Sequence, residues 1–282
     1  MSGALAAAGA MTPQDFGTIA GMVHDAAGLV VHPGKTMMVA SRLAPLLRRH
    51  GDASMKDYLD RVRRDPAEYD SMLGALTTNH TGFFREGHHF SHVSSILRPT
   101  LVPRLLDGGR VRLWSAGCST GAEVYSLAMV MLGSDSSAAR RLQNSDLRLL
   151  ATDIAEHALA VGRKACWPVA EMAAVPEALR RLWCDEADGA VTMNAVLRDL
   201  VSIRRLNLIE DWPISGTFDA IFCRNVMIYF DAATKQRLLC RFAQHLEPGG
   251  FLYIGHSERV TGAAAALLKP AGNTIYRRTA AA

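Results

Sequence analysis

The segment Ser115–Glu123 combines two glycines, small residues and an acidic side chain where a strand-like run gives way to a helix-like one. Gly117 and Gly121 would let the backbone approach a ligand closely, and the following helix would offer unpaired N–H groups. The spacing is G-x-x-x-G and no lysine follows the second glycine, so neither the dinucleotide fingerprint nor the P-loop is matched. The segment therefore predicts a ligand site that lacks both phosphate-binding patterns.

Two carboxylates indicate the kind of ligand. Glu123 stands at the predicted helix start, and Asp153 ends the next predicted strand. Asp153 could accept hydrogen bonds from both hydroxyls of a ribose, whereas Glu123 would repel a pyrophosphate and attract an amino group. This pair favours S-adenosylmethionine over NAD. Each residue also has a structural alternative, since Glu123 could simply face a helix dipole and Asp153 could cap the following helix.

Three nearby histidines raise the question of a metal. His88 and His92 have the spacing of two ligands on one helix face, and His89 lies between them. No acidic or cysteine partner completes a set of ligands nearby, and a structural zinc site takes four ligands, so we expect no metal. Cys118 lies in the glycine turn, where we expect a small filler rather than a reactive thiol.

The elements around these residues fall into two parts. Helical periodicity and capping residues predict helices over residues 13–28, 36–51, 54–65 and 66–79, with no strand before residue 110. Strands at 110–117, 147–153, 218–225 and 250–256 then alternate with helices at 122–132, 155–165 and 232–246. This alternation predicts a parallel sheet covered on both faces. It breaks down between Cys166 and Asn207, where residues 189–194 and 200–207 look like two short strands, and we interpret this region as a small β insert.

The composition is typical of an ordinary soluble protein. The chain has 282 residues, 49% hydrophobic and 21% charged, and its net charge of +4 is too mild to imply nucleic acid. Five cysteines occur without a CxxC pair, no signal-peptide pattern is present, and no apolar run has the length of a membrane span. These features favour a cytoplasmic protein that does not insert into membranes.

The positive charge is concentrated in the predicted helices between residues 31 and 64. This stretch contains eight basic residues but only three acidic ones, Asp52, Asp57 and Asp60. The eight are Lys35, Arg42, Arg48, Arg49, Lys56, Arg61, Arg63 and Arg64. Such a run is either the solvated face of amphipathic helices or a docking surface for an acidic partner.

Six segments of this chain resemble the chemotaxis receptor methyltransferases, the CheR family. They are LTTNHTGFFREGHHF (76–90), WSAGCSTGAEVYSLAM (114–129), ATDI (151–154), RLNL (205–208), FDAIFCRNVMIYFD (218–231) and GGFLYIGHSE (249–258). The resemblance implies an α/β fold, with an N-terminal all-helical domain at 1–90, a linker helix at 91–105 and a doubly wound, Rossmann-like methyltransferase domain at 106–282. A small antiparallel β insert is expected at about 166–206.

The resemblance also implies a reaction and its residues. Members transfer the methyl group of S-adenosylmethionine to glutamate side chains of chemoreceptors, giving methyl esters and S-adenosylhomocysteine. Catalytic roles are implied for Arg98 and Tyr229. The implied cofactor contacts are Asn79, Thr81, Arg85, Glu123, Asp153, Asn207, Leu208, Arg224 and Asn225. Because a glutamate has an unperturbed pKa of about 4.3, it is already the nucleophile at neutral pH, and we expect in-line displacement without a general base.

The resemblance has departures, and alternatives remain. The family pattern has glutamate and proline where this chain has Ala122 and Val124, which leaves open a cofactor-binding, receptor-docking module with little turnover. Nucleic-acid N-methyltransferases commonly carry a Pro-Pro motif that is missing here. We expect the partner to be the cytoplasmic helical domain of a chemoreceptor, docked by the basic N-terminal helices. We also expect a monomer with no nucleic-acid partner.

Overall fold

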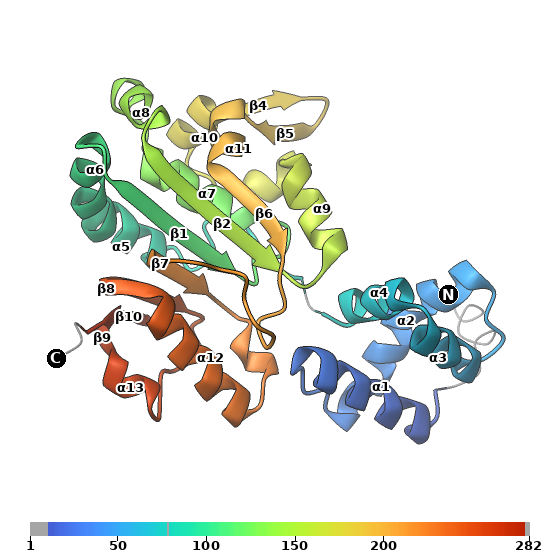
Figure 1. Ribbon diagram of the computed structural model, residues 1–282. Coiled ribbons are helices and arrows are strands. Elements are labelled where there is room, and N and C mark those ends of the chain that lie inside the picture. The colour runs from blue at the N-terminus through green and yellow to red at the C-terminus, as the bar shows by residue number, and fades with distance from the viewer. Residues whose placement is uncertain (1–10, 78, 280–282) are drawn as a thin grey trace. The chain divides into compact units, whose positions relative to one another are not determined.

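The computed structural model describes residues 11–77 and 79–279 (Figure 1). Contacts divide these residues into two compact units. The helical unit contains the described residues before position 78 together with Tyr229–Thr234, and the sheet unit contains Asn79–Ile228 and the residues from Lys235 onward. Among the described residues, no helix has both the length and the apolar character needed to cross a membrane.

The helical unit is built from helices whose ends the sequence marks clearly. They are α1 (Pro13–Ala27), α2 (Thr36–His50), α3 (Met55–Arg64) and α4 (Pro66–Leu76), with a short 3₁₀ turn η1 (Pro33–Lys35) before α2. Thr12 and Asp15 form a capping box at the start of α1, and Gly28 ends that helix in a left-handed conformation. Gly51 ends α2 in the same way. The predicted helices are therefore confirmed.

The sheet unit is organised around a seven-stranded sheet of order β6-β2-β1-β7-β8-β10-β9. Its strands are β1 (Arg110–Ala116), β2 (Asp146–Asp153), β6 (Val201–Arg205), β7 (Phe218–Cys223), β8 (Leu246–Ile254), β9 (Leu268–Gly272) and β10 (Ile275–Arg278). The pairs β1–β2, β1–β7, β2–β6 and β7–β8 are parallel, whereas β10 is antiparallel to β8 and β9. The predicted α/β class with a mostly parallel sheet is confirmed.

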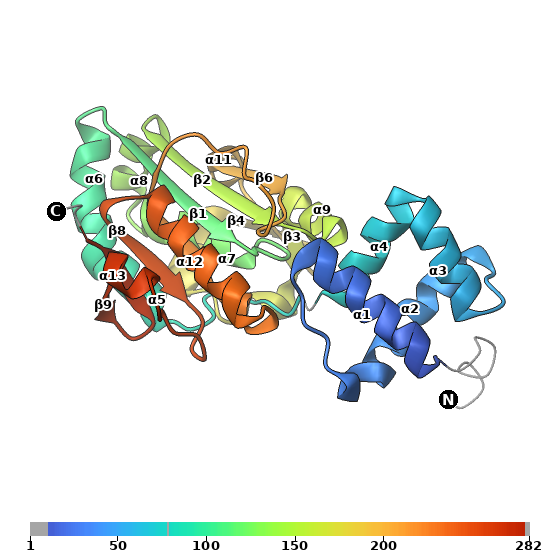
Figure 2. The same cartoon turned by 60° about the horizontal axis from the view of Figure 1, so that its bottom comes forward.

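Helices cover both faces of this sheet, as a doubly wound fold requires (Figures 1 and 2). They are α5 (His88–His92), the π-helical turn η2 (Val93–Leu97), α6 (Arg98–Leu106), α7 (Ala122–Leu132), α8 (Ser136–Gln143), α9 (Glu156–Lys164), α12 (Ala232–His245) and α13 (Ala264–Leu267), with the turn η4 (Met227–Tyr229) before α12. Leu113 of β1 joins the core that contains α7. The next residue, Trp114, points to the opposite face of the sheet. Its ring packs edge-on against that of Phe242 in α12, with 5.4 Å between ring centroids.

The insert forms a separate three-stranded antiparallel sheet, of order β3-β5-β4. It comprises β3 (Cys166–Pro168), η3 (Val169–Met172), α10 (Glu177–Trp183), β4 (Cys184–Ala187), β5 (Ala190–Met193) and α11 (Ala195–Leu200). We expected the insert to run to residue 206, with residues 200–207 as one of its strands. Instead β6 extends the large sheet, where it pairs in parallel with β2 from Val201 to Arg205. Its buried Ile203 packs into the main core.

The segment from Asn79 to Phe90, which we had assigned to the helical domain, belongs by its contacts to the sheet unit. Phe83 packs edge-on against Trp167, with 5.1 Å between ring centroids, and Phe90 is buried in the same core. The division falls at residue 78 because these aromatic side chains bury their surface against the sheet and its helices. The predicted linker helix, residues 91–105, comprises the end of α5, η2 and most of α6, and α6 packs against β1.

Candidate functional site

The site forms where parallel strands end together. Strands β1, β2, β7 and β6 run in the same direction, so the residues that follow their carboxyl ends share one edge of the sheet. The glycine turn follows β1, Asp153 ends β2, Arg224 and Asn225 follow β7, and Asn207 lies just past β6. The topology thus gathers four of the predicted segments, far apart in the sequence, at this edge.

The glycine turn after β1 is shaped by its protein neighbours. Gly117 has a φ of +80°, and a Cβ there would lie 2.3 Å from Cγ2 of Val226. Gly121 has a φ of +88°, and its missing side chain faces the Cα of Gly162 at 3.3 Å. We expected these glycines to admit a ligand. In the structure they allow left-handed backbone and close packing of the chain on itself.

Asp153 connects this turn to the end of β2. Its Oδ2 accepts a hydrogen bond from the backbone N–H of Ser119 at 2.8 Å, and its Oδ1 accepts from Ala155 at 2.9 Å. Burial raises the pKa of the Asp153 carboxyl, while these backbone donors act in the opposite direction. The hydrogen bond from Ala155 stabilises the turn that leads into α9. The alternative role of Asp153, at the start of the following helix, is therefore partly correct. Two donors do not exhaust the acceptor capacity of a carboxylate, which can still accept from hydroxyls.

Glu123 lies in a buried polar network instead of on a helix surface. Its Oε1 accepts from the hydroxyl of Ser115 at 2.7 Å, and its Oε2 accepts from Arg224 at 2.9 Å. Arg224 is itself buried, donates to the carbonyl of Arg85, and lies 3.6 Å from Oε2 of Glu86. The network joins the β1–α7 turn, the β7 loop and the segment before α5. The network contains the carboxylates of Glu123 and Glu86 but only one guanidinium, that of Arg224. A cationic group bound nearby would therefore be stabilised.

The predicted residues of the segment before α5 lie against the glycine turn. The carbonyl of Asn79 accepts from the Ser119 hydroxyl at 2.9 Å, and its side-chain amide contacts Nε2 of His157 at 3.0 Å. Arg85 donates to the carbonyl of His80 at 2.9 Å. Thr81 is half-buried between them. Three of the predicted cofactor contacts therefore come from one short segment next to Asp153 and its partner Ser119.

Asn207 and Leu208 reach the same edge through β6. The N–H of Leu206 donates to the carbonyl of Asp153 at 3.0 Å, which places the next residues beside the end of β2. Asn207 uses its amide within its own turn, where it donates to Glu210 at 2.9 Å and accepts from Ile209 at 3.3 Å. The carbonyl of Leu208 accepts from the indole N–H of Trp212 at 3.3 Å.

The backbone of Asn225 contacts Glu258, a residue that was not predicted from the sequence. The φ of Asn225 is +59°, and its backbone N–H donates to Oε2 of Glu258 at 3.2 Å. Glu258 ends the matched segment GGFLYIGHSE, but no functional role had been assigned to it. An acidic residue three positions after a glycine at a strand end was the available signal.

Of the two predicted catalytic residues, Arg98 lies away from this edge of the sheet, and Tyr229 is assigned by its contacts to the helical unit. Arg98 begins α6, and its Nε donates to the carbonyl of Met131 at 2.9 Å, at the carboxyl end of α7. Because α7 starts at the site and its 11 residues extend for about 16 Å, Arg98 lies at the opposite end of that helix. We therefore withdraw Arg98 as a catalytic residue. Tyr229 groups with the helical unit, where its carbonyl accepts from the N–H of Val30 at 2.8 Å.

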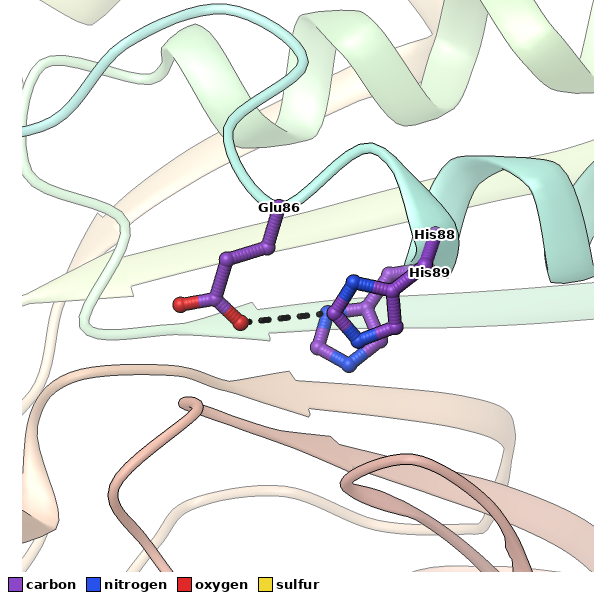
Figure 3. A group of neighbouring side chains, drawn as sticks. All are labelled: Glu86, His88 and His89. Carbon is purple, nitrogen blue, oxygen red and sulfur yellow. Dashed lines mark ion pairs between the residues drawn. The ribbon is translucent and has the colours of Figure 1, made fainter.

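Figure 3 shows the cluster formed by Glu86, His88 and His89, which differs from the expected pair of His88 and His92. Among the described residues, Glu86, His88 and His89 place ligand atoms within 4.8 Å of one another, so Glu86 is an acidic neighbour of the two histidines. Nδ1 of His89 lies 3.8 Å from Oε2 of Glu86. The guanidinium of Arg224 lies 3.6 Å from the same oxygen and would compete with a dication.

The remaining candidate groups have structural surroundings. His92 contacts the hydroxyl of Tyr253 at 2.8 Å through Nδ1, and burial lowers its pKa. Burial raises the pKa of the Cys118 thiol well above its ordinary value, and the nearby Asp153 and Glu123 act in the same direction. A thiol held in its protonated form is a poor nucleophile, which agrees with a filling role.

Comparison with known families gives two matches that together span most of the chain. Residues 14–77 match the CheR methyltransferase all-alpha domain. Residues 79–276 match the CheR methyltransferase SAM-binding domain. The boundary between the two matches coincides with the division of contacts at residue 78.

Curated relatives cover nearly the whole chain. A probable chemotaxis protein methyltransferase of Rhizobium etli is 39% identical over 264 residues, covering 92% of this chain and 97% of the relative. Chemotaxis protein methyltransferase 2 of Pseudomonas aeruginosa is 36% identical, covering 94% and 93%. The chemotaxis protein methyltransferase of Escherichia coli is 35% identical, covering 88% and 85%. Likeness to a solved structure, PKMT2 from Rickettsia typhi with AdoHcy, is weak (TM-score 0.35, 12% identity, 58% of this chain and 25% of that one).

Proposed function

Because this chain belongs to the CheR methyltransferase family, we propose that it transfers the methyl group of S-adenosylmethionine to glutamate side chains of chemoreceptors. The products would be glutamate methyl esters and S-adenosylhomocysteine. The observation that carries the proposal is the pair of buried carboxylates, Glu123 and Asp153, after adjacent parallel strands. One suits the cationic amino group of the cofactor and the other suits its ribose.

The neighbouring residues complete the proposed cofactor site. Asp153 would accept from the ribose hydroxyls, and Glu123, already held by Ser115 and Arg224, would accept from the amino group. The remaining proposed contacts are Asn79, Thr81, Arg85, Asn207, Leu208, Arg224 and Asn225. The buried Nε–H of Arg224 has no hydrogen-bond partner among the described residues, so it remains available to a carboxylate or a water.

The main contribution of the protein to this reaction would be to position the cofactor and the receptor glutamate. Bound S-adenosylmethionine would supply a methyl group activated by a sulfonium charge. A receptor glutamate, with an unperturbed pKa of about 4.3, arrives ionised and needs no general base. Holding the two reactants in line can supply about 7–11 kcal/mol of the barrier. The opposite charges cancel during transfer, so exclusion of water would favour the reaction. We propose Tyr229 as the side chain beside the transferred methyl.

The basic face of the helical unit supports the proposal for the partner. Arg48, Arg49, Arg63 and Arg64, at the ends of α2 and α3, are exposed, and Arg63 also pairs with Asp60 at 3.1 Å. We propose that they dock the acidic cytoplasmic helices of a chemoreceptor. Arg61 contributes less because it is paired with Asp52, and Arg42 donates to the carbonyls of Leu76 and Thr77 at 2.9 Å. In this proposal the enzyme acts as a monomer in the cytoplasm, where the receptor domain lies.

Calorimetric titration tests the cofactor part of the proposal. The protein should bind S-adenosylmethionine and S-adenosylhomocysteine, and NAD should give no heat of binding. Binding of NAD with no response to either adenosyl compound would refute the proposed site.

Transfer of labelled methyl to chemoreceptor-enriched membranes tests the reaction. The label should become base-labile and be released by alkali as methanol, which marks a carboxyl ester. Alkali-stable label would indicate N-methylation instead. Tight cofactor binding with no transfer to any receptor preparation would favour the docking module with little turnover.

A further inference from the structure

Glu258 is a buried carboxylate whose described partners are backbone N–H groups. The residue follows β8 and is 6% exposed. Its Oε2 accepts from Gly255 at 2.5 Å and from Asn225 at 3.2 Å, and its Oε1 accepts from Ile228 at 3.2 Å. One side chain therefore bonds to its own loop after β8 and to both ends of the loop 225–228 after β7.

The two loops also touch directly. A Cβ on Gly255 would lie 2.6 Å from Nδ2 and 2.7 Å from the backbone N of Asn225, and 2.9 Å from Oε2 of Glu258. Asn225 holds a φ of +59°, a conformation that costs free energy for a residue with a side chain. The bonds from Glu258 and the close contact with Gly255 hold this residue in that conformation.

Charges near Glu258 do not replace these backbone bonds. The adjacent Arg259 directs its guanidinium to the carbonyls of Glu258 and His256, at 2.6 and 2.9 Å. The buried Cys223 thiol is a further neighbour, and burial raises its pKa, as the carboxylate of Glu258 also does. Burial raises the pKa of Glu258 too, whereas its backbone donors favour the ionised form. Burial of a carboxylate costs free energy unless the group is hydrogen-bonded, and the backbone donors of the two loops offset that cost.

The held loop carries residues of the proposed site. Arg224 bonds to Glu123 at 2.9 Å, Asn225 follows it, and Ile228 directly precedes Tyr229 in the chain. We propose that Glu258 is a positioning residue that fixes the β7 loop so that Arg224 and Asn225 are preorganised for the cofactor. This inference rests on the proposed function, since it takes the adenosyl cofactor as the ligand.

The variant Glu258→Gln tests it, because the amide keeps the size of the side chain but presents N–H donors to backbone N–H donors. A buried donor left unsatisfied should weaken binding of S-adenosylhomocysteine about tenfold, measured by calorimetry on the full chain. Amide hydrogen exchange followed by mass spectrometry should show faster exchange in residues 224–228. Exchange around Ser119, which Asp153 holds, should be unchanged.

Asp219→Asn is a matched control. Asp219 is also 6% exposed and lies in β7 near its other end, where it accepts from the N–H of Arg112 at 2.8 Å and pairs with Arg104. This variant should be destabilised without change in cofactor affinity beyond about twofold, because it leaves the β7 loop intact.

Three results would decide the matter. Wild-type affinity in Glu258→Gln would overturn the inference, as would an equal loss of affinity in Asp219→Asn. Unchanged exchange of residues 224–228 in Glu258→Gln would also overturn it. A wild-type protein that binds no S-adenosylhomocysteine would instead refute the proposed function, and the exchange measurement would still decide whether Glu258 holds the loop.

Discussion

Asp153 combines a structural and a proposed binding role in one side chain. It bonds to Ser119 in the turn after β1 and to Ala155 before α9, so it ties two strand ends together. Its burial means that the site contains an anionic acceptor with little water around it. Hydrogen bonds to such an acceptor are stronger than in water, which suits selection of a ribose by its hydroxyls.

Asp153→Asn should therefore weaken binding of S-adenosylhomocysteine by about 10- to 100-fold, since the amide replaces one charged acceptor with a donor. Calorimetry at constant pH measures the effect. Asp185→Asn, an exposed carboxylate on β4, serves as the control and should bind like the wild type. Equal affinity in Asp153→Asn and the wild type would contradict the assignment of this residue to the ribose.

His89 predicts how stability responds to acid. Burial first, and then the charge of Arg224, lower the pKa of this fully buried imidazole from 6.5 to about 3. The unfolded chain therefore binds more protons than the folded protein between these values. The contribution of neutral His89 is complete above pH 6.5 and is lost as the pH falls toward 3, by up to about 1.4 kcal/mol per pH unit.

Denaturant unfolding of the wild type at pH 7 and pH 5 measures this slope. His89→Asn should be less stable at pH 7 and should lose less additional stability at pH 5, because asparagine does not titrate. His80→Asn, at an exposed position, should keep the wild-type slope. Identical slopes in His89→Asn and the wild type would show that another group sets the acid sensitivity.

Helix α7 is anchored at both of its ends. Its first turn contributes Glu123 to the buried network, and its last carbonyls accept hydrogen bonds from Arg98. A cation at the carboxyl end of a helix also offsets the helix dipole. Arg98, although distant from the chemistry, thus contributes to the stability of the element that carries Glu123.

Arg98→Ala should lower the free energy of unfolding by about 1–3 kcal/mol, because it leaves buried carbonyls of α7 without their donor. Affinity for S-adenosylhomocysteine should stay close to that of the wild type. Denaturant unfolding and calorimetry measure the two quantities, with Arg140→Ala on the surface of α8 as the control. A large loss of affinity without a loss of stability would return Arg98 to the site.

The β1–α7 turn predicts a difference between two glycines of similar backbone geometry. Gly117 and Gly108 have φ values of +80° and +81°, but only Gly117 has an atom, Cγ2 of Val226, where a Cβ would be. Gly108→Ala should cost about 1–2 kcal/mol of stability from backbone strain alone. Gly117→Ala should cost at least about 1 kcal/mol more because of overpacking.

Adding Val226→Ala to Gly117→Ala should recover that additional loss, as measured by thermal or denaturant unfolding. The same substitution in the wild type controls for the loss of the valine. Equal destabilisation by Gly117→Ala and Gly108→Ala would show that Val226 does not set the shape of the turn.

The molecule as a whole carries its charge unevenly. The net charge is only +4, yet the carboxyl ends of α2 and α3 carry exposed arginines. Some basic residues of the same stretch, such as Arg42 and Arg61, are engaged within the helical unit. The surface available to an acidic partner is therefore smaller than the residue count implies.

Reversal of Arg48 and Arg49 to Glu should slow receptor methylation by about tenfold or more at low salt, since complementary charge mainly raises the association rate. The difference should shrink as the salt concentration rises. Arg140→Glu/Arg141→Glu is the matched control, because this pair is also consecutive, exposed and in the last turn of a helix, α8. Equal methylation by both double variants would remove the docking proposal, while cofactor affinity should stay unchanged in each.

Local features of the sequence predicted most elements of both units. The capping residues Thr12, Gly28 and Gly51 act within a turn of their helices, so their effect can be predicted without the fold. The alternation of strands and helices predicted the mostly parallel sheet, because parallel strands need crossover connections. Asp153 and Glu123 could be predicted as site residues because strand ends are the positions where ligands bind.

Tertiary structure decided what depends on contacts between distant residues. Pairing with β2 assigned β6 to the large sheet, and the packing of Phe83 on Trp167 placed its segment with the sheet unit. The hydrogen bond from Arg98 to the carbonyl of Met131 showed that Arg98 lies away from the site. The hydrogen bond from the N–H of Asn225 to Glu258 indicated a positioning role for Glu258. The chain by itself determined its local elements and the residue types at the strand ends. Only the fold decided which of these residues meet, because the free energy of packing and of buried polar contacts depends on neighbours that the local sequence does not specify.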